Sequence, residues 1–222
     1  MRDLKIDKQG IIKKTASFVQ EKLKDAESGH DWWHILRVWN NCKLILKTEE
    51  ADSFVCELTA LLHDIADSKF HDGDEEIGPR IAGEFLSSLE VDQDSIHHVQ
   101  QIIRNMSYKA SLGKVEFHSK ELEVVQDADR LDAIGAIGIA RAFNYGGYKN
   151  REMHNPNIPP VRNQNKEVYK NSSAPTLNHF YEKLLLLKDK MNTPTAKAIA
   201  TERHLYMESF LQQFYAEWRG DK

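Results

Sequence analysis

The chain has 222 residues, two cysteines and a formal net charge of −4 at pH 7. A chain of this length buries enough surface to fold without disulfides, and Cys42 and Cys56 form no CxxC pair, which favours a reducing, cytoplasmic location. The acidic balance argues against non-specific nucleic-acid binding, and we expect neither a secretory signal nor a membrane span, because no apolar run is suitable for either.

Apolar residues recur at helical spacing from the first predicted element onward. Residues 12–26 outline one helical face, and residues 31–47 outline a second, for which Asp31 is a candidate N-cap. A third, more apolar helix begins near Phe54 and ends in the stretch LLHDIADSKF, residues 61–70. That stretch places an imidazole and two carboxylates at the end of a helix that is predicted to be buried.

The second half of the chain continues the helical pattern. Asp74 and Asp94 are candidate caps of a fourth and a fifth helix. A long helix is predicted from Ser119 to Phe143, and the final helix is predicted over residues 193–218, with a threonine cap followed by proline. The fold class is therefore all-α, with roughly eight to ten helices in one domain covering residues 1–222.

Two segments depart from the pattern. Residues 114–117 are the only short run that alternates like a strand. Residues 146–173 hold three of the six prolines and five lysines and arginines, with almost no periodicity. A segment of this length without helical pattern is typical of a lid over a binding site or of a mobile loop, and both interpretations stay open; the basic residues would allow a lid to contact phosphate.

Three places offer metal-ligand side chains on predicted helices. They are the pair His30 and His34, the doublet His63-Asp64, and the aspartates Asp127, Asp129 and Asp132. Each place has a structural alternative: a hydrogen-bonded core histidine, or a solvated acidic face with Arg130 paired to a carboxylate. Charged groups at the end of a buried helix need compensation, which either a shared metal ion or a salt-bridge network provides.

Taken together, His34, His63-Asp64 and Asp129 resemble the signature of the HD-domain metal-dependent phosphohydrolases, in which an isolated His, a His-Asp doublet and a distant Asp lie on helices. The ADRL segment around Asp129 is similar to that of the (p)ppGpp hydrolase branch. Five segments of the chain, in order, resemble one bacterial subgroup that is linked to nucleoside triphosphate pyrophosphohydrolase activity. They are HDWWHILRV, LLHDIADSKF, VQDADRLDAIGAIGIARAF, NHFYEKLLLLKDKM and ATERHLYMESFLQQFYAEW.

The resemblance implies an HD-type helical bundle with one divalent metal ion (Mn, Ni, Co, Fe, Zn or Mg), bound by His34, His63, Asp64 and Asp129. A mixed nitrogen and oxygen set suits transition metals better than Ca²⁺. The implied reaction is hydrolysis of a nucleoside or deoxynucleoside triphosphate to monophosphate and pyrophosphate by a metal-activated water. The partner is then a small-molecule nucleotide rather than nucleic acid or membrane, and the sequence leaves monomer and homodimer both open.

Two further residues are candidates for catalysis. Asp67 follows His63 by four residues and matches the first position of the acidic pair in the (p)ppGpp hydrolases, but Ser68 stands at the second. This departure argues against a (p)ppGpp substrate and leaves Asp67 as the candidate general base, with a helix-end salt bridge to Lys69 as the alternative. His30 is a candidate either for protonating a leaving group or for holding the tautomer of His34.

Basic residues are the candidates for contacting substrate phosphates. They are Arg37, Lys69, Arg130, His179 and Lys183. Arg37 lies one turn after His34, and His179 and Lys183 share a helical face, although a solvated surface pair has the same spacing.

Two other function classes stay open beside the triphosphate hydrolase. One is a non-catalytic HD module that senses a nucleotide. The other is an HD phosphatase or phosphodiesterase acting on another phosphorylated small molecule. The chain contains no GxxxxGK loop, which excludes a P-loop NTPase.

Overall fold

The structure is a computed structural model, and it describes residues 7–24, 31–66, 74–106, 117–161 and 173–221. Within these ranges the chain forms nine α-helices, one 3-10 helix and no strand, which confirms the predicted all-α class. Most of the predicted strand, residues 114–116, lies outside the described residues. None of the helices described is both long enough and apolar enough to cross a membrane.

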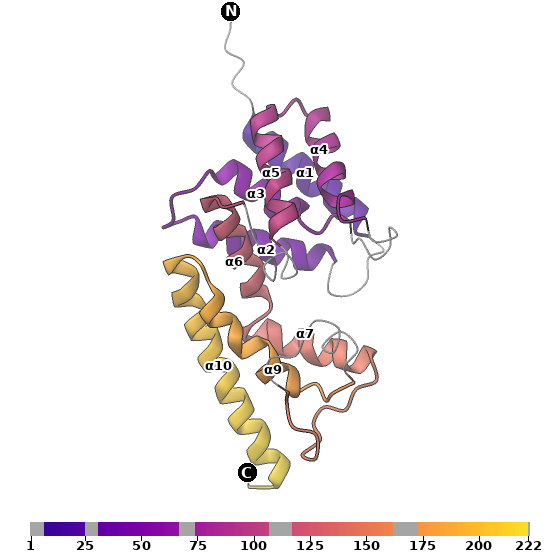
Figure 1. The fold of residues 1–222 in the computed structure, drawn as a ribbon, viewed down its shortest axis with the longest axis vertical. Coiled ribbons are helices and arrows are strands. Elements are labelled where there is room, and N and C mark those ends of the chain that lie inside the picture. Colours follow the sequence, from indigo (N-terminus) through magenta and orange to yellow (C-terminus); the bar gives the residue numbers. More distant parts are fainter. Residues whose placement is uncertain (1–6, 25–30, 67–73, 107–116, 162–172, 222) are drawn as a thin grey trace, which may run out of the picture. The chain divides into compact units, whose positions relative to one another are not determined.

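The helices follow one another in a simple order (Figure 1). They are α1 (Lys8–Lys22), α2 (Trp32–Ile45), α3 (Ser53–Leu62), α4 (Ile77–Ser88), α5 (Gln93–Asn105), α6 (Lys120–Asp132), α7 (Gly135–Tyr148), α9 (Asn178–Glu182), the 3-10 helix η3 (Leu184–Lys190) and α10 (Pro194–Arg219). The packing divides the chain into two compact units, residues 1–129 and 130–222, and α6 crosses their boundary. The single domain over residues 1–222 stays a prediction.

The core of the first unit is built around α3. This helix contacts α1, α2 and α5, and α4 packs on α5. Eight of the ten residues of α3 are buried, which explains why its sequence is apolar on every side. The Asp52 carboxylate caps its start by accepting a hydrogen bond from the Phe54 N–H at 2.9 Å. The helix ends at Leu62, so the His63-Asp64 doublet emerges directly from the core.

The two cysteines face each other across this core. Cys42 on α2 and Cys56 on α3 are both buried, free thiols. A hydrogen bond with Cys42, together with burial, raises the pKa of the Cys56 thiol. Both residues therefore act as small, unreactive core side chains.

The second unit has an aromatic core. Helix α10 contacts α7 and η3, and η3 contacts α9. The rings of Phe143, Phe180, Phe210 and Phe214 form a chain of neighbours with centroids 6.0 to 6.3 Å apart. These contacts connect α7, α9 and α10 and account for the aromatic content of the last third of the sequence.

The segment predicted as a lid or mobile loop, residues 146–173, begins inside α7, which continues to Tyr148. In the non-helical stretch that follows, the His154 ring lies edge-on to three aromatic rings of α10, Phe214, Tyr215 and Trp218, at centroid distances of 5.0 to 6.2 Å. Residues 162–172 lie outside the described part of the chain. A lid function for this segment stays a prediction.

Three predicted helix starts are confirmed by their caps. Asp31 accepts a hydrogen bond from the backbone N–H three residues on, at 2.9 Å. Ser119 does the same for the Leu122 N–H at 3.1 Å, and Thr193 for the Ala196 N–H at 3.2 Å. In each case the side chain satisfies one of the backbone donors that a helix start leaves unpaired.

Two predicted caps are wrong by two residues. Helix α5 is capped by Asp92, whose carboxylate accepts from the Ser95 N–H at 2.8 Å, and Asp94 lies inside the first turn. Helix α4 begins at Ile77, and Asp74 instead closes the preceding turn by accepting from the Glu76 N–H at 2.9 Å.

The predicted continuous helix from Ser119 to Phe143 is in fact two helices, α6 and α7. Gly135, the first residue of α7, has a φ of +76°, a conformation that L side chains rarely adopt. A β-carbon at this position would lie 3.0 Å from Cγ of Arg203, whose guanidinium donates to the Leu131 carbonyl. The break therefore depends on a glycine at this position.

Gly135→Ala is expected to lower the free energy of unfolding by about 1–2 kcal/mol, because both the positive φ and the close Arg203 side chain oppose a β-carbon. Gly147→Ala is the matched control: a β-carbon there meets nothing within 4 Å, so the better helix former should stabilise α7 by about 0.5–1 kcal/mol. Urea unfolding followed by far-UV circular dichroism measures both variants. Equal changes would contradict the strain assigned to residue 135.

Candidate metal centre

His34 lies in the first turn of α2, on the face of the helix that packs into the first unit. The Asp31 carboxylate caps this turn by accepting a hydrogen bond from the His34 backbone N–H, which fixes the position of the histidine. His34 is only 2% exposed, and Val38 and Ile45 are buried on the same face. The imidazole therefore points inward rather than to solvent.

His63 follows the last residue of α3, and its two ring nitrogens are in different situations. Nδ1 lies 3.0 Å from the Ala60 carbonyl oxygen, so this nitrogen carries the proton and donates. Nε2 then holds the lone pair, and it is buried with no hydrogen-bond partner in the described part of the chain. Buried polar atoms are nearly always paired, and a metal ion is the partner that suits an imidazole oriented by a carbonyl at its other nitrogen.

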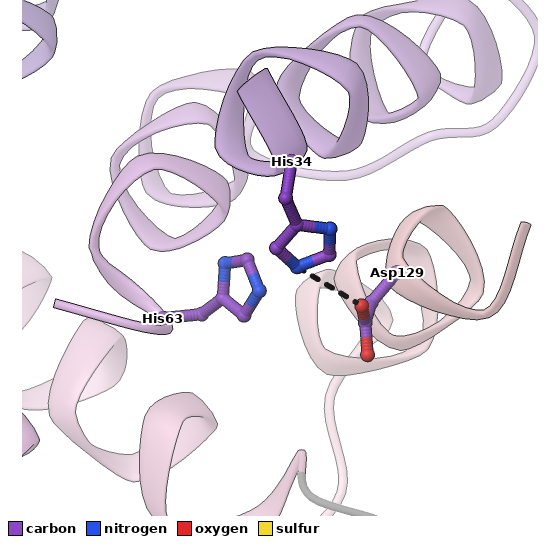
Figure 2. Close-up of side chains that lie close together, drawn as sticks. All are labelled: His34, His63 and Asp129. Carbon is purple, nitrogen blue, oxygen red and sulfur yellow. Dashed lines mark ion pairs between the residues drawn. The ribbon is translucent and has the colours of Figure 1, made fainter. Parts of the chain in front are cut away.

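Two carboxylates approach the imidazoles. The Asp129 Oδ1 atom, on α6, lies 3.6 Å from Nε2 of His34, and each of His34, His63 and Asp129 offers one ligand atom within 4.8 Å of the others. Figure 2 shows these three side chains converging from α2, the end of α3 and α6. The Asp64 Oδ2 atom lies 3.5 Å from Nε2 of His34 and 3.7 Å from Nε2 of His63. The four predicted ligands thus lie together.

This arrangement fits a divalent cation. Donors at about 2.0–2.2 Å from one ion are separated by about 3 Å when adjacent and about 4.4 Å when opposite, and the distances from Asp64 and Asp129 to the imidazoles fall in this range. Two neutral imidazoles and two carboxylates carry a formal charge of −2, which such an ion balances. The mixed nitrogen and oxygen set is typical of Mn, Fe, Co, Ni or Zn.

The candidate centre is buried on one side and open on the other. The His34 and His63 side chains are each 3% exposed, whereas those of Asp64 and Asp129 are 32% and 42% exposed. A water molecule or a substrate oxygen can therefore approach past the carboxylates while the imidazoles form the buried floor.

Four other predicted site residues belong to the first half of the chain. Arg37 lies on α2, one turn after His34, and is partly exposed. The other three, His30, Asp67 and Lys69, lie outside the described residues.

The remaining predicted phosphate contacts, Arg130, His179 and Lys183, belong to the second unit. The Arg130 guanidinium donates to the Lys190 carbonyl. The alternative in which the aspartates around Asp129 form a solvated face is wrong, because Asp127 is 0% and Asp132 is 2% exposed. Asp132 is paired with Arg141.

Sequence reasoning missed Asn41, which joins the two helices that carry His34 and Asp129. It lies on α2 two turns after His34, is 9% exposed, and its Nδ2 donates to the Ala128 carbonyl oxygen at 3.1 Å. Ala128 directly precedes Asp129, so this bond fixes α6 against α2 next to the ligands. The sequence did contain a signal for this role: Asn41 is a polar residue on the face of the helix predicted to be buried, seven residues after the candidate ligand His34.

Asn41→Ala is expected to weaken metal binding by about 10- to 100-fold, the range typical of residues that orient ligands. Asn40→Ala is the matched control, because Asn40 is the exposed neighbour on the same helix. Isothermal titration of both variants with Mn²⁺ gives the affinities, and their urea midpoints separate a loss of positioning from a loss of folding. Equal affinities in the two folded variants would contradict the role of Asn41.

Comparisons with known proteins agree with this geometry. The HD domain family matches residues 32–134. The Bacillus subtilis protein YpgQ is 38% identical over 206 residues, which covers 92% of each chain. The crystal structure of an HD-superfamily hydrolase from Bacillus thuringiensis is 46% identical, covers 96% of this chain and 98% of its own, and has a TM-score of 0.77. The structure of YpgQ in complex with ADP is 34% identical, covers 95% and 96% of the chains, and has a TM-score of 0.73.

Proposed function

The chain belongs to the HD-domain family of hydrolases, and on that premise we propose that it is a metal-dependent phosphohydrolase that cleaves nucleoside or deoxynucleoside triphosphates to monophosphate and pyrophosphate. The observation that carries the proposal is the convergence of two imidazoles and two carboxylates around one point of the first unit. These four residues, His34, His63, Asp64 and Asp129, would hold the ion. When bound, a divalent ion lowers the pKa of water and polarises a phosphate oxygen.

A nucleotide substrate is supported by one relative. The structure of YpgQ from Bacillus subtilis was solved with ADP, and that protein resembles this chain over nearly its whole length. ADP contains a phosphoanhydride bond, the class of bond that the proposal requires. The choice of a triphosphate and of its α,β bond is the part that goes beyond this support.

The remaining roles fall to side chains around the centre. We assign Arg37, which lies one turn after His34 on α2, the role of balancing negative charge on a phosphate near the ligands. From the sequence, Asp67 accepts the proton of the attacking water, Lys69 contacts phosphate, and His30 acts at the leaving group or on the His34 tautomer. The exposed edges of Asp64 and Asp129 leave room for the substrate to enter.

A substrate panel tests the proposal. The protein is stripped with a chelator, reloaded with Mn²⁺, Co²⁺, Ni²⁺, Zn²⁺ or Mg²⁺, and given nucleoside and deoxynucleoside triphosphates, monophosphates and cyclic nucleotides. We expect monophosphate and pyrophosphate, identified by mass, only in the metal-loaded samples. Diphosphate with orthophosphate would reassign the bond cleaved, and turnover in chelator would contradict metal dependence.

The same panel separates the alternative functions. A nucleotide-sensing HD module would bind nucleotides without forming product from any of them. A phosphatase or phosphodiesterase for another phosphorylated small molecule would leave the triphosphates intact and turn over monoesters or cyclic diesters. Either result would overturn the triphosphate assignment.

A further inference from the structure

The candidate ligand Asp129 lies in the last turn of α6, where a helix is held least well by its own backbone. Helix ends fray, because the last four carbonyls lack an N–H partner four residues further on. In α6, which ends at Asp132, the carbonyls of Arg130 and Leu131 accept instead from N–H groups three residues on, at 3.1 and 3.3 Å. A carboxylate that must stay beside the imidazoles (Figure 2) therefore needs support from outside this helix.

Two arginines from later helices bind the end of α6. Arg203 on α10 donates through Nη1 to the Leu131 carbonyl at 2.5 Å. Arg141 on α7 donates through Nη1 to the Asp132 carboxylate at 2.5 Å and to the Asp132 carbonyl at 3.4 Å. Leu131 is 0% and Asp132 is 2% exposed, so both bonds are made to buried residues. The turn that carries Asp129 is thus fixed two and three residues after the ligand.

The charges at this helix end also call for cations. The C-terminal end of a helix carries a partial negative charge, and α6 adds three aspartates there, Asp127, Asp129 and Asp132. Burial lowers the pKa of Arg203, and the charge of Asp132 opposes this shift. A guanidinium nevertheless stays charged at pH 7, so Arg203 supplies positive charge beside the last turn of α6.

Gly135 holds the Arg203 side chain on its course. A β-carbon at residue 135 would lie 3.0 Å from Cγ, 3.1 Å from Cβ and 3.3 Å from Cδ of Arg203, so the apolar stem of the arginine packs directly on the glycine. Much of the side-chain freedom is therefore restricted by packing, independently of the bond to Leu131. The guanidinium is a fixed donor rather than a mobile surface group.

We propose that Arg203 is a positioning residue of the metal centre. By binding the Leu131 carbonyl and balancing the charge of Asp132, it fixes the last turn of α6 and with it the direction of the Asp129 carboxylate. This role complements that of Asn41, which binds the carbonyl just before Asp129. The inference rests on the metal centre of the proposed function, and it is independent of which substrate is cleaved.

Titration of the full chain with Mn²⁺ tests the role of Arg203. Arg203→Met keeps an apolar stem against Gly135 and removes the guanidinium, so we expect Mn²⁺ binding to weaken by about 10- to 100-fold. Arg203→Lys returns a cationic donor and should recover most of this affinity. Arg219→Met is the matched control on α10, because Arg219 is exposed and pairs with Asp221; it should bind Mn²⁺ as the wild type does.

The visible absorption of bound Co²⁺ separates positioning from a loss of stability, because the bands depend on the number and geometry of the ligands. At saturating Co²⁺ we expect altered bands in Arg203→Met and wild-type bands in Arg203→Lys and Arg219→Met. Urea midpoints of the metal-free proteins are measured alongside. If Arg203→Met does not fold, Arg203→Gln, which also lacks the charge, is subjected to the same two measurements.

Two results would overturn the proposal. One is wild-type Mn²⁺ affinity and wild-type Co²⁺ bands in a folded variant that lacks the guanidinium. The other is weaker binding with unchanged bands and a lowered urea midpoint, which would assign Arg203 to stability alone. A wild-type protein that binds neither ion would instead contradict the metal centre itself, so the two failures are distinguishable.

Discussion

His34→Ala and Asp129→Ala are expected to lose bound metal and to lower turnover by on the order of a thousandfold or more. Each variant removes one of the four donors, each of which lies 3.5 to 3.7 Å from a neighbouring donor. Without the cation, the carboxylates that remain in this partly buried site lose the charge that balances them. Metal content is measured by inductively coupled plasma mass spectrometry after loading and desalting. Turnover is measured on the best substrate from the panel.

Thermal unfolding separates metal loss from misfolding. A cation that binds only the folded state stabilises it by about 2.7 kcal/mol at a concentration of 100 times its Kd. Added Mn²⁺ should therefore raise the Tm of the wild type and leave the Tm of both variants unchanged. His97→Ala, an exposed histidine on α5, should respond as the wild type does. Full metal content in both ligand variants would end the assignment of the centre.

The sequence was sufficient to predict most of the fold, because helical periodicity reports which face of each segment is buried. Its failures share one physical cause, which is that periodicity is insensitive to local backbone geometry. The break between α6 and α7 depends on a single positive φ at Gly135, and the spacing of apolar residues on either side does not reveal it. The choice between Asp92 and Asp94 as a cap depends on the direction from which the chain enters α5.

In the candidate site too, some residues were predicted from the sequence and others were missed. His34, His63, Asp64 and Asp129 were predicted as a set from the resemblance to the HD-domain signature, and the structure brings their side chains together, although their ligand roles stay a prediction. Asn41 was missed because its partner is a backbone carbonyl, which no residue pattern records. The buried state of Asp132 was missed because its partner, Arg141, lies beyond a helix break that the sequence did not reveal.

Asp67→Asn is expected to leave metal content unchanged and to lower kcat by about 10²- to 10⁴-fold, the range that a positioned general base contributes. Asp67 lies outside the described residues, so this prediction depends on its place three residues after Asp64 and on the resemblance to the acidic pair of related hydrolases. The amide cannot accept a proton from the attacking water, but it keeps the shape of the carboxylate.

Lys69→Gln distinguishes this role from the alternative in which Asp67 only forms an ion pair with Lys69. If the ion pair is the whole role, both variants remove the same interaction and cause the same small loss of stability, about 0–1 kcal/mol for an exposed pair, with similar kcat values. If Asp67 is the base, Asp67→Asn lowers kcat steeply, whereas Lys69→Gln chiefly raises KM by weakening a phosphate contact. Matching kinetics in the two variants, with metal retained in both, would therefore remove Asp67 from the catalytic residues.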